Sequence, residues 1–335
     1  TMEISILETV WFALTGVLLG AFTVTGGFDF GAGIALGFLK PGRQKDFAAR
    51  SITPFWDANQ VWLITAGGAL FAAFPKAYSA ILSTMYTPVM LLLMLLVLRV
   101  VGIEFYPFES GKKWRAFWGG VIFASSLLSA VLMGVALGAI YGGALLKPYG
   151  GFWEGFLRLF TPLSICSGIL YAAFFAAYGA AFLRLRAPET AEFSRVPRAA
   201  GIAHAVLMLA FVAYAAALLF KFRENSQPMA MAAAGIAAAY ICLSASARFA
   251  RRRKNGAAFA LDALFALVLV AVHCASAYPN IIPPSPDGRS MGIAEAASSP
   301  TTLAIMLAVA GIGVPLALAY NIYAWTVFRS GKGEY

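Results

Sequence analysis

Charged residues are scarce in this chain. Asp, Glu, Lys and Arg make up 12% of its 335 residues, whereas soluble proteins average roughly 25% because they must cover their surface. Hydrophobic residues make up 61%, and the mean hydropathy is +0.78. Such a chain has too little polar surface to shield its apolar mass from water, so lipid must be its solvent. We therefore expect an all-α integral membrane protein.

Metal-binding and nucleophilic motifs are scarce as well. The two histidines, His204 and His273, fall in separate apolar stretches without a spaced third ligand, which argues against a haem or metal site. The three cysteines, Cys166, Cys242 and Cys274, are odd in number and also lie in apolar stretches, so structural disulfides are not expected. Catalytic triads, glycine-rich phosphate loops and zinc spacings are absent. The sequence therefore predicts no catalytic residue and no metal ligand.

Nine apolar stretches are long enough to cross a bilayer, which takes about 20 mostly apolar residues. They cover approximately residues 8–36, 55–74, 78–99, 116–142, 160–183, 200–220, 229–247, 257–278 and 302–328. The connecting segments are short, apart from about 20 residues before the last stretch. We therefore expect nine transmembrane helices in a single membrane domain over residues 1–335, without an appended soluble domain.

The basic residues are distributed unevenly between the two sides of these spans. If the N-terminus is outside, 19 of the 25 Lys and Arg residues fall in inner segments and 6 in outer segments. Positive charge favours the cytoplasmic side, so we predict a periplasmic N-terminus and a cytoplasmic C-terminus. The Lys and Arg residues that give the net charge of +10 lie beside the ends of the spans and do not form a basic domain. We therefore expect contacts with anionic lipids and no nucleic-acid partner.

Acidic side chains within or beside the spans are few, and each needs a reason because a carboxylate in hydrocarbon costs several kcal/mol. Asp29 lies late in the first span, Asp57 opens the second, and Glu104 follows the third. With the N-terminus outside, all three fall in the cytoplasmic half or at its edge. Asp262 lies early in the eighth span, next to a basic run. Arg99, at the end of the third span, is a candidate ion-pair partner, or its side chain reaches the interface.

Two interpretations of these acids remain open. Buried carboxylates relay protons, which would make them a proton or cation route from the cytoplasm. Alternatively, they cap helices or form ion pairs; Asp57 follows Pro54 at a helix start, where a carboxylate offsets free amides. For Asp57 the two interpretations are equally well supported. The position of Asp29 inside an apolar helix favours the functional interpretation. Glu104, taken alone, is typical of a solvated acid in a loop.

Pairs of glycines four residues apart indicate close helix packing. They are Gly16/Gly20, Gly27/Gly31 and Gly33/Gly37 in the first span and Gly134/Gly138 in the fourth. This pattern is common in membrane proteins, and it predicts a tight bundle without indicating a chemistry.

The segments around the acids are unusual strings. They read GFDFGAG at residues 27–33, WDANQVWLITAGGALFAAFP at residues 56–75 and RVVGIE at residues 99–104. These strings resemble subunit II of cytochrome bd-type quinol oxidases, and the second is long and highly specific. Strong similarity covers roughly the first 110 residues; beyond them span number and loop lengths agree. The short loops favour the cyanide-insensitive branch.

The resemblance implies a complex that oxidises quinol and reduces dioxygen to water. It implies a fold of two four-helix bundles plus one extra helix for this subunit. In that family haems b and d belong to subunit I, and subunit II carries no haem. We therefore expect a multi-pass protein of the bacterial inner membrane that forms a heterodimer with a haem-bearing subunit I. A structural quinone or lipid in this subunit, and a small single-span accessory subunit, are left open.

The resemblance also assigns the acids. Asp57 and Glu104 match the family's acidic positions on the cytoplasmic proton path, and Asp29 matches the acid of its first motif. Reduction of dioxygen consumes protons, which titratable groups must carry past apolar helices. This chain has Gly26 where some members have a further acid, and Phe55 where some have a histidine. An auxiliary proton relay at those two positions is therefore not supported.

Two alternatives share these physical features. A proton-coupled secondary transporter would place its sites on broken helices in matching halves, but no such paired interruption and no internal repeat is visible. A purely structural scaffold for subunit I would differ only in whether the acids carry protons.

Overall fold

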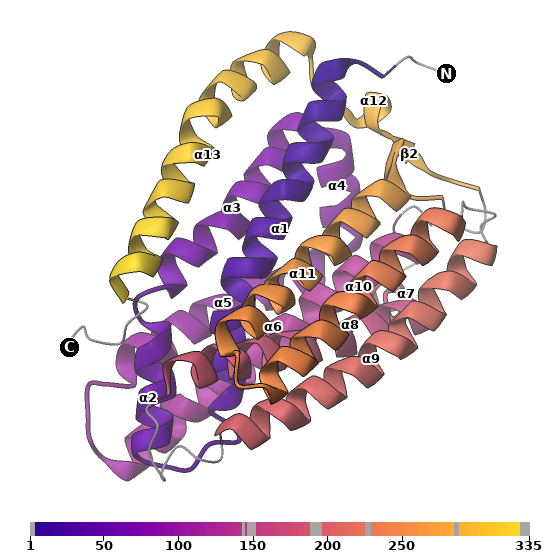
Figure 1. The fold of residues 1–335 in the computed structure, drawn as a ribbon. Helices are drawn as coiled ribbons and strands as arrows, with labels where there is room; N and C mark the ends of the chain where they lie inside the picture. The colour runs from indigo at the N-terminus through magenta and orange to yellow at the C-terminus, as the bar shows by residue number, and fades with distance from the viewer. Residues whose placement is uncertain are drawn as a thin grey trace.

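The computed structural model describes residues 4–142, 145, 152–187, 196–224, 229–284 and 288–328, and almost all of them are helical (Figure 1). Four basic residues that entered the topology argument, Lys147, Arg195, Arg329 and Lys332, lie outside these ranges.

Eight helices of the described chain are long and apolar enough to cross a membrane. They are α1 (Ile6–Ala35), α5 (Tyr86–Phe105), α6 (Lys112–Tyr141), α8 (Pro162–Arg186), α9 (Val196–Glu224), α10 (Met229–Arg251), α11 (Asn255–Ala277) and α13 (Pro300–Phe328). Helices are suited to lipid because most of their backbone hydrogen bonds form within the segment itself. The chain is therefore a multi-pass membrane protein.

The helix α3 (Trp56–Ala73) is followed directly by α4 (Pro75–Thr84), which is turned by 118° from it. Pro75 is the first residue of α4 and lacks the N–H that would continue α3, and Phe74 leaves the helical conformation with φ −132° and ψ 63°. The predicted continuous span over residues 78–99 is therefore wrong in its first turns, because α5 begins only at Tyr86. The prediction of nine crossings requires α3 and α4 to count as one.

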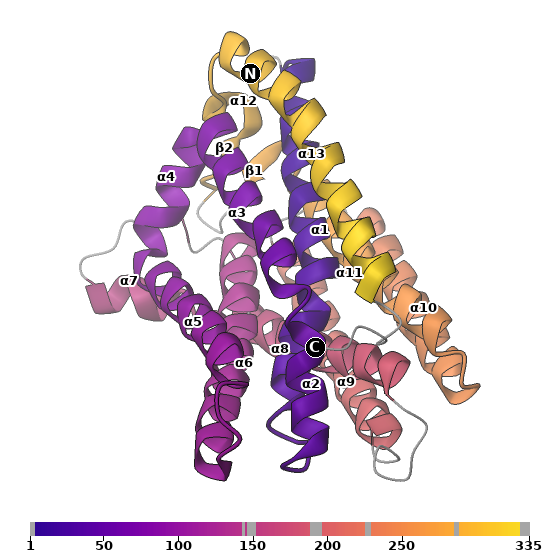
Figure 2. The same cartoon turned by 90° about the vertical axis from the view of Figure 1, so that its left-hand side faces the viewer.

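Shorter elements lie at the two ends of the bundle. The antiparallel pair β1 (Asn280–Ile282) and β2 (Met291–Gly292) and the helical turn α12 (Ile293–Ala296) lie at one end, and α2 (Arg43–Ile52) lies at the other (Figure 2). The short helix α7 (Phe152–Arg158) precedes α8. None of these elements is long enough to cross a bilayer.

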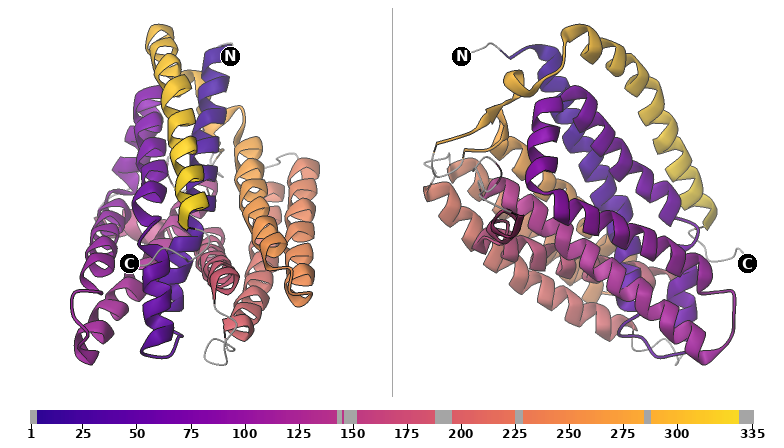
Figure 3. Two further views of the ribbon diagram at one scale, coloured as in Figure 1. Left: turned by 60° about the vertical axis from the view of Figure 1, so that its left-hand side comes forward. Right: turned by 180° about the vertical axis from the view of Figure 1, so that it is seen from behind.

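The helix α8 is central and α13 is peripheral. In the most apolar part of α8, 72% of the residues are buried, against 6% in α13. α8 packs against α1, α6, α9 and α11, whereas α13 runs along the outside (Figure 3). An aromatic cluster still attaches α13 to the bundle: Trp325 stacks on Phe259, which also contacts Phe28 and Phe182.

Two glycine positions allow α8 to approach its neighbours closely. A Cβ atom on Gly31 of α1 would lie 1.8 Å from the carbonyl oxygen of Phe175, and one on Gly134 of α6 would lie 2.4 Å from that of Ser167. Both carbonyls belong to α8. The pairs Gly27/Gly31 and Gly134/Gly138 therefore mark crossings with α8, whereas Gly16/Gly20 face α11 and Gly33/Gly37 face α6.

Gly31→Ala is expected to destabilise the protein by about 3 kcal/mol or more, because backbone atoms of α8 cannot move aside as a side chain can. The thermal unfolding midpoint of the purified protein measures the loss. Gly120→Ala in α6 is the matched control, since nothing lies within 4 Å of its added Cβ. Equal midpoints for the two variants would contradict the close crossing.

Candidate functional site

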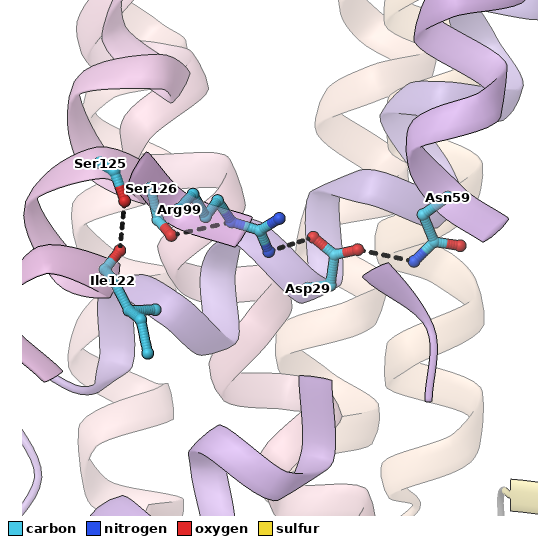
Figure 4. Close-up of polar contacts among 6 residues, drawn as sticks. All are labelled: Asp29, Asn59, Arg99, Ile122, Ser125 and Ser126. Atoms are coloured by element: carbon cyan, nitrogen blue, oxygen red, sulfur yellow. Dashed lines mark hydrogen bonds and ion pairs between the residues drawn. The ribbon is translucent and has the colours of Figure 1, made fainter. Parts of the chain in front are cut away.

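Four helices meet at an ion pair inside the bundle (Figure 4). Asp29 of α1 is 1% exposed and Arg99 of α5 is 0% exposed, and Nη2 of Arg99 donates to Oδ1 of Asp29 over 2.6 Å. Nδ2 of Asn59, on α3, donates to Oδ2 over 2.8 Å. Both carboxylate oxygens of Asp29 are therefore occupied from opposite sides.

The guanidinium of Arg99 is held by further contacts. Its Nε donates to Oγ of Ser126 on α6 over 3.1 Å, and its central carbon lies 3.9 Å from the ring centroid of Phe30. Its Nη1 has no hydrogen-bond partner among the described residues. The positive charge is thus neutralised by Asp29 and sandwiched between a hydroxyl and an aromatic face.

The ion pair is best explained as a constraint on assembly. Removing two charges from water costs several kcal/mol each, and their attraction repays this only with good geometry and additional hydrogen bonds. Asn59 and Ser126 supply those bonds. Once the pair is formed, sliding α1 or α5 would leave a charge unpaired in a medium without water, and sliding α3 or α6 would remove one of the hydrogen bonds that support it.

The other two predicted acids point away from this centre. Asp57 and Glu104 are exposed at the surface of the chain. Asp57 is two residues before Asn59 and Glu104 is five after Arg99, offsets that place them on different helix faces from those inward-facing residues. The structure therefore brings Asp29 and Arg99 together and leaves Asp57 and Glu104 outside the cluster.

The two exposed acids also differ in their helix position. Asp57 lies in the first turn of α3, where its charge is favourable to the helix dipole, but the N-cap residue is Phe55 and makes no side-chain cap. Glu104 is inside the last turn of α5, not in a loop beyond it, and an acid at that end is unfavourable to the dipole. Glu104 thus occupies a position that helix stability does not explain.

A second polar cluster, which the sequence did not predict, lies at the α2 end of the bundle. Asp46 of α2 accepts hydrogen bonds from Nη1 of Arg115 over 2.5 Å and from the hydroxyl of Tyr106 over 2.9 Å. Burial, followed by the hydrogen bond to Asp46, raises the pKa of Tyr106 above its ordinary value, so the hydroxyl remains a donor. The cluster ties α2 to the α5–α6 connection. Asp46 lies 69 residues from Arg115, and no local pattern signals the pairing.

The two histidines differ in how far their ring nitrogens are engaged. His273 is buried, with Nδ1 bonded to the carbonyl of Leu269 and Nε2 to the hydroxyl of Tyr214. His204 bonds the carbonyl of Leu243 through Nε2 and turns Nδ1 towards Asp262, at 4.0 Å from its Oδ1. Within the described residues no three His, Cys, Asp or Glu side chains come together as a metal site.

Comparisons with known proteins agree on one family. The model for cytochrome bd terminal oxidase subunit II matches residues 7–328. The chain is 29% identical to the cytochrome bd-I ubiquinol oxidase subunit 2 of Escherichia coli K12, covering 98% of this chain and 96% of that protein. It is 28% identical to the cytochrome bd ubiquinol oxidase subunit 2 of Bacillus subtilis, covering 96% of each.

A solved structure agrees in fold. A chain of the bd oxidase from Geobacillus thermodenitrificans superposes with a TM-score of 0.77, over 97% of this chain and 99% of that one. The sequence identity is 18%, so this likeness concerns the fold alone.

Asp29→Asn is expected to destabilise the protein by about 3–5 kcal/mol, because it leaves Arg99 charged and unpaired in the bundle. The double variant Asp29→Asn, Arg99→Gln should lose less unfolding free energy than the sum of the losses in the two single variants. Thermal unfolding of the purified protein measures all of them.

Arg115→Gln provides the comparison for this prediction, since it breaks a pair whose side chains are 28% and 23% exposed. The Arg115→Gln variant should lose about 1 kcal/mol of unfolding free energy or less. A loss for Asp29→Asn no larger than this would show that the buried pair does not constrain the bundle.

Proposed function

This chain belongs to the cytochrome bd terminal oxidase subunit II family, and we propose that it is the haem-free subunit of a respiratory complex that oxidises quinol and reduces dioxygen to water. Membership makes it a subunit of an oxidoreductase complex that includes subunit I and haems. In this proposal the subunit supports subunit I in a heterodimer and supplies part of the cytoplasmic proton path. The complex would lie in the bacterial inner membrane, with the N-terminus of this chain outside.

The observation that carries the proposal is the exposure of two acids on apolar helix faces. Asp57 shares a face of α3 with Val61, Ile64 and Phe71, which are 44%, 69% and 58% exposed. These positions follow the helical repeat, so one continuous strip of α3 is apolar with a carboxylate at its end. A bare carboxylate on such a strip would cost several kcal/mol in lipid.

Glu104 repeats this arrangement on α5. It follows Met90 and Val97 at seven-residue intervals, and both are exposed. α3 and α5 lie on the same side of the molecule, where α13 also runs (Figure 2). A partner subunit on this side would cover the apolar strips and enclose both carboxylates, where titration becomes useful for proton transfer.

Asp29 has a different role in this proposal. Its two oxygens already accept hydrogen bonds from Asn59 and Arg99, so the carboxylate is held in one position between them. We assign it as the fixed charge that borders the proton path, with Arg99 as its partner. Asp57 and Glu104 are then the groups that gain and lose protons as dioxygen is reduced.

The haems are assigned to subunit I because the family resemblance implies that location, and in this chain both ring nitrogens of His273 are already hydrogen-bonded. Quinol oxidation is assigned to the complex and not to a site within this subunit. The broken pair α3–α4 is a feature that a secondary transporter also uses, but transporters carry such breaks in two matching halves. No second pair of this kind occurs among the described helices, so the oxidase subunit remains the better-supported function.

Asp57→Asn and Glu104→Gln are each expected to lower quinol-driven oxygen consumption of the intact complex by about tenfold or more, because the relay loses a titratable group. Proton uptake should fall in parallel. Glu109→Gln is the matched control, since Glu109 is an exposed acid between α5 and α6. Unchanged oxygen consumption and proton uptake in both variants would reduce the subunit to a scaffold.

Gentle purification through a tag on this chain should yield a haem-bearing partner, detected by its visible absorption spectrum. After the subunits are separated, the haem bands should remain with the partner. A preparation of this chain without any haem-bearing partner would contradict the oxidase proposal.

A further inference from the structure

A cavity of about 1530 Å³ opens where α8 and α10 end and where α9 and α11 begin. It forms because α9 packs mainly on α8 and α10 mainly on α11, while α9 and α10 have little contact with each other. The cavity is remote from the Asp29–Arg99 pair in the chain, and the proposed oxidase function does not use it. It is larger than most small-molecule pockets, which hold roughly 300–1,000 Å³.

The charge of the cavity wall is strongly positive. Among the residues that the structure describes, five arginines line it, and one carboxylate, Asp262 of α11, opposes them. The five are Arg184, Arg248, Arg251, Arg252 and Arg253. Like charges gathered around one space repel each other unless an anion lies among them. Arginine also offers a planar fork of donors that matches the oxygens of a phosphate.

Two buried polar atoms in the wall have no hydrogen-bond partner in the described part of the chain. Asp262 is 2% exposed, and its Oδ1 accepts no hydrogen bond from the described residues. Nε of Arg184, on α8, donates none. Buried polar atoms are nearly always paired in native proteins, so both atoms indicate an occupant that accepts from Arg184 and donates to Asp262.

The position of His204 on α9 also indicates an occupant that donates a hydrogen bond towards Asp262. Its Nε2 must carry the proton that bonds the carbonyl of Leu243, so in the neutral ring Nδ1 is an acceptor that faces Oδ1 of Asp262 at 4.0 Å. Two acceptors that face each other need a donor between them, which a hydroxyl group or a water supplies.

The rest of the wall is apolar and continues to the outer surface of the bundle. Ala177 and Ala181 of α8 and Ala205, Met208 and Leu209 of α9 line it, and Leu209 is 73% exposed. A free phosphate compound would gain nothing from such a wall. An acyl chain would lie along it while its headgroup remained among the arginines.

We propose that this cavity is a binding site for one acidic phospholipid, whose phosphodiester contacts Arg184 and Arg248 and whose acyl chain lies along α9. Basic pockets between transmembrane helices are suited to such headgroups. Asp262 shares the cavity wall with Arg184 and is opposite to it in charge. It also disfavours ligands of higher negative charge, so a singly charged phosphodiester with hydroxyl groups fits best. The lipid fills the gap between α9 and α10 and thereby joins the two helix pairs.

The test measures lipid retained by the intact purified complex and its thermal stability. Phosphatidylglycerol is the probe, in phosphatidylcholine vesicles, and inorganic phosphate is the soluble comparison. Native mass spectrometry should detect one retained phosphatidylglycerol in the wild type. Arg184→Gln, Arg248→Gln should weaken its binding by roughly thirtyfold, the factor expected for two arginines near acidic lipid.

Lys112→Gln, Lys113→Gln is the matched control, because it removes the same charge from exposed positions at the start of α6. It should retain the lipid as the wild type does. If the first double variant does not fold, Arg248→Gln, Arg251→Gln replaces it, since both of those side chains are exposed.

Equal loss of lipid in the test and control variants would overturn the site in favour of general surface charge. Stabilisation by inorganic phosphate equal to that by phosphatidylglycerol would overturn the lipid as ligand, and so would a wild type that retains no lipid. Because the readout is bound lipid and not oxygen consumption, these outcomes are independent of the proposed oxidase function.

Discussion

The ion pair between Asp29 and Arg99 is the contact on which the arrangement of the first helices depends. Neither charge can be left alone in hydrocarbon, so α1 and α5 must meet at one height. Asn59 and Ser126 extend the requirement to α3 and α6. Close packing makes the meeting possible, because Gly31 lets α1 approach α8 to backbone contact only two residues after Asp29.

The same constraint explains where the remaining acids lie. With Asn59 turned inward, Asp57 must face outward from α3, and with Arg99 turned inward, Glu104 lies on another face of α5. The sequence strings around the acids therefore contain two kinds of residue. One kind holds the bundle in register, and the other presents carboxylates on an apolar surface that a partner can cover.

Much of this fold could be predicted from the sequence. Hydropathy predicted the long helices because each satisfies a length and composition rule that does not depend on its neighbours. The break at Pro75 is visible as a proline, but the 118° turn that follows depends on what α4 packs against. The hydrophobic run therefore suggested a continuous span that the structure divides at Met85.

The site was predictable in its residue types and not in its pairings. Asp29 and Arg99 stood out because charges are rare in apolar helices, yet they are 70 positions apart in the chain, and no sequence pattern pairs residues at that separation. The pairing of Asp46 with Arg115 has no sequence pattern at all. The arginine-lined cavity arises from a gap between α9 and α10, which is a property of packing and not of any single helix.

The central claim is that Asp29 stays ionised as a structural charge while Asp57 and Glu104 exchange protons. Infrared difference spectroscopy of the intact complex, between its oxidised and reduced states, tests this most directly, because a carboxylic acid that changes protonation gives a carbonyl band. We predict bands that disappear in Asp57→Asn and Glu104→Gln and persist in Asp29→Asn. A carbonyl band that disappears only in Asp29→Asn would contradict the account.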